Sequence, residues 1–222
     1  MRKHIRIIAL LIAVLLAFGL AACGGGNSSE SADGSASEPE AGTESEATSE
    51  NPSGETEKAG TQTDKDVLVV YFSMTGTTRG VAEKIAAVTD ADIYEIKAAQ
   101  EYTSDDLDYD NSDSRTTHEQ NDPSARPEIG SDPVSLDGYS TGYIGYPIWW
   151  GQEPRIMDTF VESQDFDGIT VVPFCTSGSS GIGSSGQNLA ENAGSGSWLE
   201  GQRFDGNVTE DELKAWIDGL SE

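Results

Sequence analysis

The segment from residue 67 to residue 78, VLVVYFSMTGTT, restricts the possible folds of this chain more than any other. Val67 to Phe72 form a continuous apolar and aromatic run, which is what a strand needs in a parallel sheet covered on both faces. Small hydroxyl residues around Gly76 end this run, and a helical pattern begins near Thr77. The first backbone N–H groups of a helix have no partner within it and point into the preceding loop. The segment predicts a strand, an anion-binding loop and a helix in succession.

The loop at residues 73–78 suits a phosphate monoester. Gly76 lets the backbone approach an anion closely, because it has no Cβ atom. Four hydroxyl groups supply further donors, those of Ser73, Thr75, Thr77 and Thr78. The loop that binds nucleoside triphosphates requires Gly-Lys-Ser/Thr, and no such lysine is present here. We therefore expect a monophosphate rather than a triphosphate.

Strand and helix patterns alternate along the rest of the chain. The expected strands are residues 67–72, 93–96, 142–146, 170–174 and 198–204. The expected helices are residues 80–88, 154–161, 184–193 and 209–220, the last opened by a capping box of Thr209 and Glu212. This alternation predicts an α/β fold with a doubly wound sheet of five parallel strands. Such sheets bind ligands beyond the carboxyl ends of their strands.

Two further strands also run into loops of small or flat residues. Tyr143 to Gly151 reads YIGYPIWWG, and Val171 to Gly186 reads VVPFCTSGSSGIGSSG. Together with Ser-x-Thr-Gly-x-Thr after the first strand, these segments resemble the flavodoxin family, whose members carry electrons on FMN. The similarity covers residues 66–220 and is closest to the subgroup with a Tyr-Pro-x-Trp-Trp-Gly loop and a Thr-Ser-Gly loop. The resemblance implies the flavodoxin-like strand order 2-1-3-4-5 and FMN as cofactor.

The resemblance assigns one part of FMN to each loop. The phosphate loop (Ser73–Thr78) takes the phosphate, the Trp loop (Pro147–Gly151) lays one indole against the isoalloxazine ring, and the Ser-Gly loop (Thr176–Gly181) hydrogen-bonds the pyrimidine edge through its backbone. The expected FMN-binding residues are Ser73, Met74, Thr75, Gly76, Thr77, Thr78, Pro147, Ile148, Trp149, Trp150, Gly151, Thr176, Ser177, Gly178, Ser179 and Gly181. Met74 departs from the subgroup, which usually has a charged or polar residue at this position.

Either tryptophan of the Trp loop is a candidate for stacking on the ring. Adjacent residues of a strand point to opposite faces, so at least one of Trp149 and Trp150 should lie near the surface. An exposed indole beside Gly151 favours a ligand over ordinary burial. Stacking on an electron-rich indole and an acidic surround both disfavour negative charge on the reduced ring. We therefore expect a low reduction potential.

Two other segments match ligand-binding motifs only in part, one a dinucleotide fingerprint and the other a calcium loop. Gly181 to Gly186 fits the dinucleotide fingerprint, with Glu200 at the distance of its acidic partner, but it follows the fourth strand and leaves too little chain for the second half of a dinucleotide fold. Asp108, Asp110 and Glu119 have calcium-loop spacing, but the sixth position of that loop requires Gly and here is Asp113. We expect neither a dinucleotide nor a calcium ion at these motifs.

Single reactive side chains do not form a catalytic set. His118 is the only histidine after residue 22 and lies in an irregular, polar region, so we expect it to be solvated. Cys175 ends an apolar strand, and packing is its expected role. The two are far apart in sequence, and no nucleophile triad or metal cluster is expected.

Residues 1–22 are typical of a lipoprotein signal peptide. Basic residues precede an apolar run from Ile7 to Leu16 that is too short for a stable membrane span. Leu20-Ala21-Ala22-Cys23 forms a lipobox, so cleavage would leave Cys23 as a lipid-modified N-terminus. Residues 23–65 are polar and acidic, which predicts a disordered tether, and residues 66–222 are the expected FMN-binding domain. We expect a protein anchored by lipid outside the cytoplasmic membrane.

The formal net charge of −26 excludes nucleic acid as a partner and suits docking on basic redox proteins. The leading hypothesis is an FMN-binding electron-transfer protein whose partner is a redox protein or a small electron acceptor. One alternative is an FMN-dependent NAD(P)H:quinone-type oxidoreductase. Another is a binding lipoprotein that has kept the fold without the cofactor.

The segment from residue 100 to residue 133 should separate the carrier from the reductase. It is longer than an ordinary connection and rich in Asp and Asn. A carrier needs only an exposed ring edge, whereas a reductase needs a pocket above the ring. The family subgroup often has a Tyr, a short helix and an Arg-Pro pair in this region, and the similar residues here are Tyr102, Arg115, Glu119, Arg126 and Pro127.

Overall fold

The computed structural model of the protein describes residues 65–220. The predicted signal peptide, the lipidation site at Cys23 and residues 23–64 of the predicted tether lie outside the described residues, as do residues 221–222. Among residues 65–220, no helix has both the length and the apolar character needed to cross a membrane.

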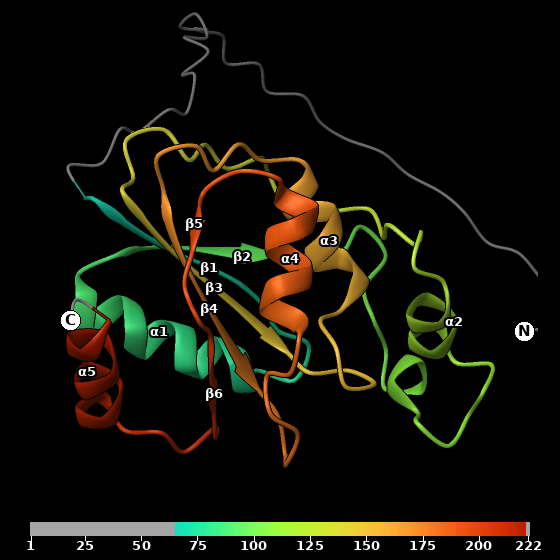
Figure 1. Ribbon diagram of the computed structural model, residues 1–222. Coiled ribbons are helices and arrows are strands. Elements are labelled where there is room, and N and C mark those ends of the chain that lie inside the picture. Colours follow the sequence, from blue (N-terminus) through green and yellow to red (C-terminus); the bar gives the residue numbers. More distant parts are fainter. Residues whose placement is uncertain (1–64, 221–222) are drawn as a thin grey trace, which may run out of the picture. The chain divides into compact units, whose positions relative to one another are not determined.

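Parallel strands form one sheet at the centre of the described chain (Figure 1). The strands are β1 (Val67–Phe72), β2 (Asp92–Ile96), β3 (Thr141–Pro147), β4 (Thr170–Thr176), β5 (Ser197–Trp198) and β6 (Gln202–Phe204). Their order in the sheet is β2-β1-β3-β4-β5, with β6 also paired to β4. The predicted α/β class and strand order 2-1-3-4-5 are confirmed. This order places the carboxyl ends of β1, β3 and β4 next to one another.

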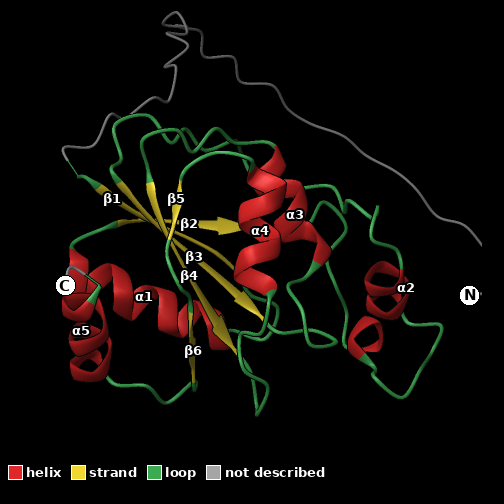
Figure 2. Cartoon of the chain, in the orientation of Figure 1, coloured by secondary structure: helices red, strands yellow, loops and turns green. Residues whose placement is uncertain are grey.

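Helices cover both faces of the sheet (Figure 2), with α1 and α5 on one face and α3 and α4 on the other. The helices are α1 (Thr77–Thr89), α2 (Arg115–Asn121), α3 (Arg155–Glu162), α4 (Ser185–Ala193) and α5 (Glu210–Gly219). Strand β1 needs both layers: Val69 and Tyr71 belong to the core with α1, and Leu68, Val70 and Phe72 to the core with α3. Since every second residue of a strand faces the same way, an apolar run must be covered twice.

The predicted capping box at the start of α5 is confirmed. The backbone N–H of Glu212 donates to Thr209 Oγ1 over 3.3 Å, and the N–H of Thr209 donates to Glu212 Oε2 over 2.9 Å. Two donors that the helix leaves unpaired are thereby satisfied. The sequence therefore located the beginning of this helix to the residue.

The expected strand at residues 198–204 is interrupted, because Pro173 lies opposite its middle. Val171 of β4 pairs with Trp198, and Phe174 of β4 pairs with Gln202. Three residues of the outer strand therefore face two residues of β4, which is a bulge. Pro173 has no N–H to donate to the ladder, so the pairing is lost at this point and resumes in β6.

The segment of residues 100–133, predicted to be irregular, contains a short 3-10 helix, η1 (Asp105–Leu107), and the helix α2. An antiparallel bridge between Ala98 and Ile129 closes its base beside β2. The buried residues of α2 are Thr116 and Thr117 rather than apolar residues. Helices are predicted from the periodic spacing of apolar residues. Since α2 buries no apolar residue, its sequence gives almost no sign of a helix.

Candidate functional site

Thr176, at the end of β4, joins the three predicted loops at the carboxyl edge of the sheet. Its hydroxyl lies 2.8 Å from the hydroxyl of Thr78 in α1, and both residues are buried. Its carbonyl oxygen accepts a hydrogen bond from the backbone N–H of Ile148 over 2.9 Å. The phosphate loop and the Trp loop are thus both fastened to the first residue of the Ser-Gly loop.

The phosphate loop presents backbone donors at the start of α1. Gly76 is the N-cap residue, with φ at +88°, and its N–H donates to Ser73 Oγ over 3.1 Å. The first helical hydrogen bond runs from Gly80 N to Gly76 O, so the N–H groups of the three residues before Gly80 have no partner within the helix. No side chain among residues 65–220 caps this helix end. The helix start is therefore open to an anion.

The four hydroxyl groups of the phosphate loop differ in their surroundings. Thr75 and Thr77 are exposed, with their hydroxyl oxygens 3.4 Å apart. Ser73 accepts from the loop backbone, and the buried Thr78 is bound to Thr176. Thr75 and Thr77 are thus the hydroxyl donors best placed for a ligand, while Ser73 and Thr78 shape the loop.

Arg79, the cationic residue that follows the loop in sequence, is engaged elsewhere. Its guanidinium forms an ion pair with Glu95 of β2, and its Nε donates to the Tyr71 hydroxyl over 3.2 Å. Burial raises the pKa of Tyr71 above its ordinary value, so this hydroxyl is neutral at physiological pH. The positive character of the phosphate loop therefore comes from backbone N–H groups and the helix dipole rather than from a side chain.

Met74, the departure from the family subgroup, packs against the apolar core. It also lines a cleft of about 330 Å³ at the carboxyl ends of β1 and β2, together with Phe72, Lys97 and Tyr102. These contacts explain why an apolar side chain is suited to position 74. The backbone donors of the loop do not depend on the identity of this side chain.

The Trp loop is a two-residue hairpin turn. Trp149 and Gln152 exchange two backbone hydrogen bonds of 2.9 Å, and the two residues between them, Trp150 and Gly151, have φ of +53° and +80°. Positive φ at both central positions defines a type I′ turn. The expectation that one tryptophan would be exposed is met, but the reason given for it was wrong. The separation results from the turn and not from alternation along a strand.

Only part of the Trp loop is available to a ligand. Ile148 and Trp149 belong to the core, where the Trp149 ring packs edge-on against Phe72 and Tyr102. Trp150 is 40% exposed. Of the two tryptophans, Trp150 is therefore the candidate for stacking, and Trp149 supports the loop from below.

Tyr109 is a neighbour of Trp150 that sequence reasoning missed. Their ring centroids lie 5.0 Å apart in an edge-to-face arrangement, and Tyr109 is 51% exposed. Tyr109 comes from the segment of residues 100–133, which therefore reaches the Trp loop. The only sequence signal was an aromatic residue in a run of acidic ones.

The Ser-Gly loop is held by Arg203 of β6, which sequence reasoning also missed. The guanidinium Nη2 donates to the carbonyl oxygens of Ser177 and Gly178, over 2.5 and 3.2 Å. Gly178, Ser179 and Gly181 are exposed. The contact depends on the pairing of β6 with β4, which no local sequence pattern shows.

The base of the segment of residues 100–133 is a cluster around Glu119 of α2. Tyr102 donates to Glu119 Oε2 over 2.8 Å, and Arg115 Nε donates to Glu119 Oε1 over 2.7 Å. The Arg115 guanidinium also lies 3.9 Å from the centre of the Tyr102 ring. Burial and the Glu119 carboxylate raise the pKa of Tyr102 far above its ordinary value. These are residues that the family resemblance singled out.

The calcium motif does not converge on a metal site. Glu119, its expected last ligand, is engaged with Tyr102 and Arg115. Within the part of the chain that the structure describes, no three His, Cys, Asp or Glu residues are placed to hold a metal ion. His118 is exposed.

A buried charged network lies behind the Trp loop. Glu153 is buried and accepts from Asn188 of α4 over 3.2 and 3.3 Å. Arg155 pairs with Asp158 at 3.2 Å and donates to the backbone oxygen of Glu119 over 3.3 Å. Burial raises the pKa of Glu153 to about 7. The network links α2, α3 and α4.

Cys175 is a free, buried thiol. Burial raises its pKa to about 12, so it carries almost no thiolate at neutral pH. Its side chain belongs to the apolar core, which agrees with the packing role expected from the sequence.

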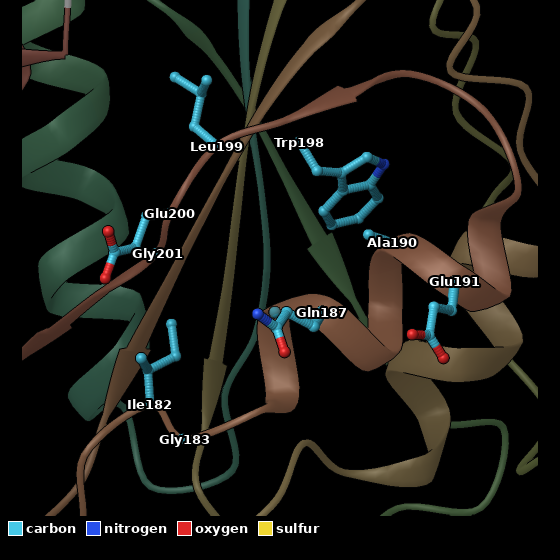
Figure 3. A pocket seen from close by; sticks show the side chains of 10 residues that line it. Ile182, Gly183, Gln187, Ala190, Glu191, Trp198, Leu199, Glu200 and Gly201 are labelled. Carbon is cyan, nitrogen blue, oxygen red and sulfur yellow. The ribbon is translucent and has the colours of Figure 1, made fainter.

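A larger cleft, of about 820 Å³, lies between α4 and the outer strands (Figure 3). Gly183, Glu191 and Glu200 line it (Figure 3). Gly186 of the dinucleotide fingerprint also lines it. Glu200 is the acidic partner that the fingerprint would require, so its place at this cleft does not argue against a dinucleotide. The prediction that no dinucleotide binds here rests on the position of the motif after the fourth strand.

Comparison with known proteins identifies relatives over the described domain. A family model for flavodoxin matches residues 66–220. A crystal structure from Bacteroides eggerthii DSM 20697, named as a flavoprotein, is 44% identical, covers 71% of this chain and 98% of that chain, and has a TM-score of 0.67. A similar protein from Bacteroides uniformis ATCC 8492 is 43% identical, with coverages of 69% and 98% and a TM-score of 0.66. No curated protein matches the chain.

A more distant structure shares the fold. It is a flavoprotein from Lactobacillus acidophilus NCFM in complex with FMN, and it is 23% identical to this chain. It covers 71% of this chain and 99% of that chain, with a TM-score of 0.54.

Proposed function

The chain belongs to the flavodoxin family, and we propose that it binds FMN at the carboxyl edge of its sheet and transfers electrons. The observation that carries the proposal is the junction at Thr176, which holds the phosphate loop, the Trp loop and the Ser-Gly loop together. A bound FMN supplies the redox chemistry, since its ring takes up and releases one or two electrons. The protein supplies the binding groups and their charges.

The phosphate loop fits the phosphate of FMN through its backbone. The N–H groups of Thr77, Thr78 and Arg79 precede the first helical hydrogen bond, and the positive end of the α1 dipole lies at the same point. The exposed hydroxyls of Thr75 and Thr77 add donors. A phosphate monoester therefore finds donors without a lysine.

The Trp loop and the Ser-Gly loop fit the two other parts of FMN. Trp150 offers a half-exposed indole for stacking on one ring face. The backbone N–H groups of Gly178 and Ser179 make no hydrogen bond within residues 65–220, so they are available to the pyrimidine edge.

An electron carrier is the function that the acidic character of the chain favours. A net charge of −26 accelerates encounter with basic redox proteins and repels anionic ones. The partner is therefore a basic redox protein or a small electron acceptor.

A second candidate is an oxidoreductase that takes hydride from NAD(P)H and reduces a quinone or a similar acceptor. The observation in its favour is the cleft of about 330 Å³ beside the phosphate loop, lined by Met74, Lys97 and Tyr102 among others. The ordered segment of residues 100–133 forms one wall of this cleft through Tyr102. The same segment also reaches the proposed stacking residue, since the Tyr109 ring lies edge-on to Trp150 with the ring centroids 5.0 Å apart. A carrier has no need of a wall beside the ring, whereas a reductase needs a pocket for its substrate.

The lipobox ending at Cys23 supports anchoring outside the cytoplasmic membrane, with residues 24–65 as a tether. Replacing Cys23 by Ala should remove the lipid and shift the protein from the membrane fraction to the soluble fraction. Metabolic labelling with a fatty acid should mark the wild type and not the variant. Labelling of both proteins, or of neither, would show the anchoring proposal to be wrong.

FMN titration of the purified full-length protein tests the main proposal. We expect shifted visible absorption bands and flavin fluorescence quenched by Trp150, with the flavin retained on a desalting column. Subsequent addition of NAD(P)H separates the two redox functions, because a reductase bleaches the yellow colour and a carrier does not. Unquenched flavin that elutes separately would exclude both and leave the binding lipoprotein.

A further inference from the structure

Arg203 lies directly behind the Ser-Gly loop. It is the middle residue of β6 and pairs with Cys175 of β4, one residue before the loop begins at Thr176. Because the two strands are parallel, the carboxyl end of β6 reaches the same edge of the sheet as the loop. The guanidinium therefore belongs to the proposed site although it comes from a different strand.

Arg203 hydrogen-bonds the backbone of the loop and the side chain of Ser177. Nη2 donates to Ser177 O over 2.5 Å and to Gly178 O over 3.2 Å, and Nε lies 3.3 Å from Ser177 Oγ. The Ser177 hydroxyl in turn donates to the carbonyl oxygen of Ser180. Within residues 65–220, Arg203 is the one side chain from outside the loop that hydrogen-bonds residues 177–180.

These contacts determine which way the N–H groups of the loop point. In a trans peptide the carbonyl of one residue and the N–H of the next lie in one plane and point in opposite directions. When the carbonyls of Ser177 and Gly178 point at Arg203, the N–H groups of Gly178 and Ser179 point away from it. These are the two free donors that the proposed function assigns to the pyrimidine edge.

The same contact brings a positive charge to the loop. The carboxylate nearest to Arg203 is that of Asp205, at 3.8 Å, and it is 60% exposed. A pair of this length at the surface is weak, so the charge of the guanidinium is only partly neutralised. A cation beside the loop stabilises negative charge that accumulates on a ligand there.

We propose that Arg203 is a positioning residue for the flavin: it orients the N–H groups of Gly178 and Ser179 toward the pyrimidine edge and raises the reduction potential of the bound ring. The inference rests on the proposed binding of FMN. Arg203 would then have two separable effects. The geometry of its guanidinium orients the N–H groups of the loop, and its charge raises the reduction potential of the flavin.

Two variants of the full-length protein separate these effects. Arg203→Gln removes the charge and the fork of donors, so we expect oxidised FMN to bind about tenfold more weakly and reduced FMN about a hundredfold more weakly. The tenfold difference corresponds to a midpoint potential lowered by ~30 mV for a two-electron couple. Arg203→Lys keeps the charge without the fork. It should weaken the binding of both forms several-fold and leave the potential near that of the wild type.

Arg126→Gln is the matched control. Arg126 is 29% exposed, like Arg203, and also donates to two backbone oxygens and pairs with a carboxylate. Its partner Glu162 ends α3, at the opposite edge of the sheet from the site. Potentials are measured by reductive titration with dithionite beside a reference dye, and affinities by flavin fluorescence.

Each outcome decides between the inference and the proposed function. If the wild type binds no FMN, the proposed function is wrong and the role of Arg203 falls with it. If the wild type binds FMN and Arg203→Gln matches Arg126→Gln in affinity and potential, only the role of Arg203 is wrong. If Arg203→Gln does not fold, Arg203→Lys decides, because wild-type affinity in that variant would exclude orientation by the guanidinium fork.

Discussion

At the scale of single residues, Trp150 has a backbone conformation that bulky side chains rarely adopt. Its φ of +53° belongs to a type I′ turn, where Asn, Asp and Gly are the usual residues. The left-handed conformation costs about 1–2 kcal/mol for a residue with a Cβ atom. Strain that is retained at an exposed aromatic residue is typical of a functional position.

Replacing Trp150 by Asn should therefore separate stability from binding. The free energy of unfolding should change by less than ~1 kcal/mol, because Asn relieves the left-handed strain but loses the edge-to-face contact with Tyr109. The affinity for FMN should fall about three- to tenfold with the loss of stacking, and the quenching of flavin fluorescence should be lost. Urea unfolding and fluorescence titration measure the two effects.

Trp149→Ala is the control for Trp150→Asn, because it removes the buried tryptophan of the same loop instead of the exposed one. Trp149 is 4% exposed and packs against Phe72 and Tyr102, so its removal should destabilise the fold by about 3–5 kcal/mol. A Trp150→Asn variant that still quenches flavin would assign the stacking to another ring.

Gly76 and Gly80 are two nearby glycines at which replacement by Ala should change the stability of the protein in opposite directions. Gly76 has φ of +88°, so Gly76→Ala should destabilise the protein by about 1 kcal/mol or more and weaken FMN binding by distorting the phosphate loop. Gly80 lies inside α1, and a Cβ atom there would meet nothing within 4 Å. Gly80→Ala should therefore stabilise the protein by about 0.4–1 kcal/mol.

Thermal unfolding and FMN titration of both variants check this pair. The signs of the two stability changes should be opposite although both replacements are Gly to Ala in one stretch of five residues. Equal affinity for FMN in Gly76→Ala and wild type would mean that the phosphate does not bind at this loop.

At the scale of secondary-structure elements, buried charges determine how α2, α3 and α4 are held together. Arg155 at the start of α3 donates to backbone oxygens of α2 and pairs with Asp158, while Glu153 accepts from Asn188 of α4. A buried pair of this kind contributes little net stability but restricts which arrangement is adopted. The segment of residues 100–133 is therefore positioned mainly by polar contacts.

The pKa of Glu153 makes this arrangement sensitive to pH. Burial raises its pKa to about 7 in the folded protein, above the ordinary value of 4.5. A raised carboxyl pKa means that the folded state holds the proton more tightly than the unfolded state. The contribution of Glu153 to stability is thus fully present below about pH 4.5 and is lost as the pH rises through about 7.

Glu153→Gln should remove this pH dependence. The difference in unfolding free energy between wild type and variant should change by ~1.4 kcal/mol for each unit of pKa shift between pH 4.5 and 7, and should be constant above about pH 8. Chemical denaturation at a series of pH values measures it, and comparing the two proteins cancels the titration of the other acidic groups. A constant difference across this range would mean that Glu153 titrates normally.

What the sequence predicted at this scale was local, and what it missed depends on contacts between distant residues. The strand at Val67–Phe72, its loop and the capping box at Thr209 follow from patterns within a few residues, and all are observed. The interruption of the last strand follows from Pro173 on the neighbouring strand. Arg203 reaches the Ser-Gly loop only through the register of β6 with β4. A single sequence contains no signal for such register.

At the scale of the whole molecule, the negative field of the protein and the local cation at Arg203 act on the flavin in opposite directions. The chain has 39 Asp and Glu residues against 13 Lys and Arg residues. Repulsion from many distant carboxylates disfavours the negative charge that the ring gains on reduction, whereas the attraction of one nearby guanidinium stabilises that charge. The two contributions differ in range, and therefore in their response to salt.

We expect the midpoint potential of the bound FMN to lie below that of free FMN at low ionic strength, because the indole of Trp150 and the acidic surround both disfavour negative charge on the ring. The Debye length falls from about 30 Å at 0.01 M salt to about 8 Å at 0.15 M. Added salt should therefore raise the potential by screening the distant carboxylates, while the contribution of Arg203 in contact with the loop persists. In Arg203→Gln the rise with salt should be the same and the whole curve should be displaced downward. A wild-type potential above that of free FMN at low salt would contradict this account, since neither the acidic field nor the indole would then control the flavin.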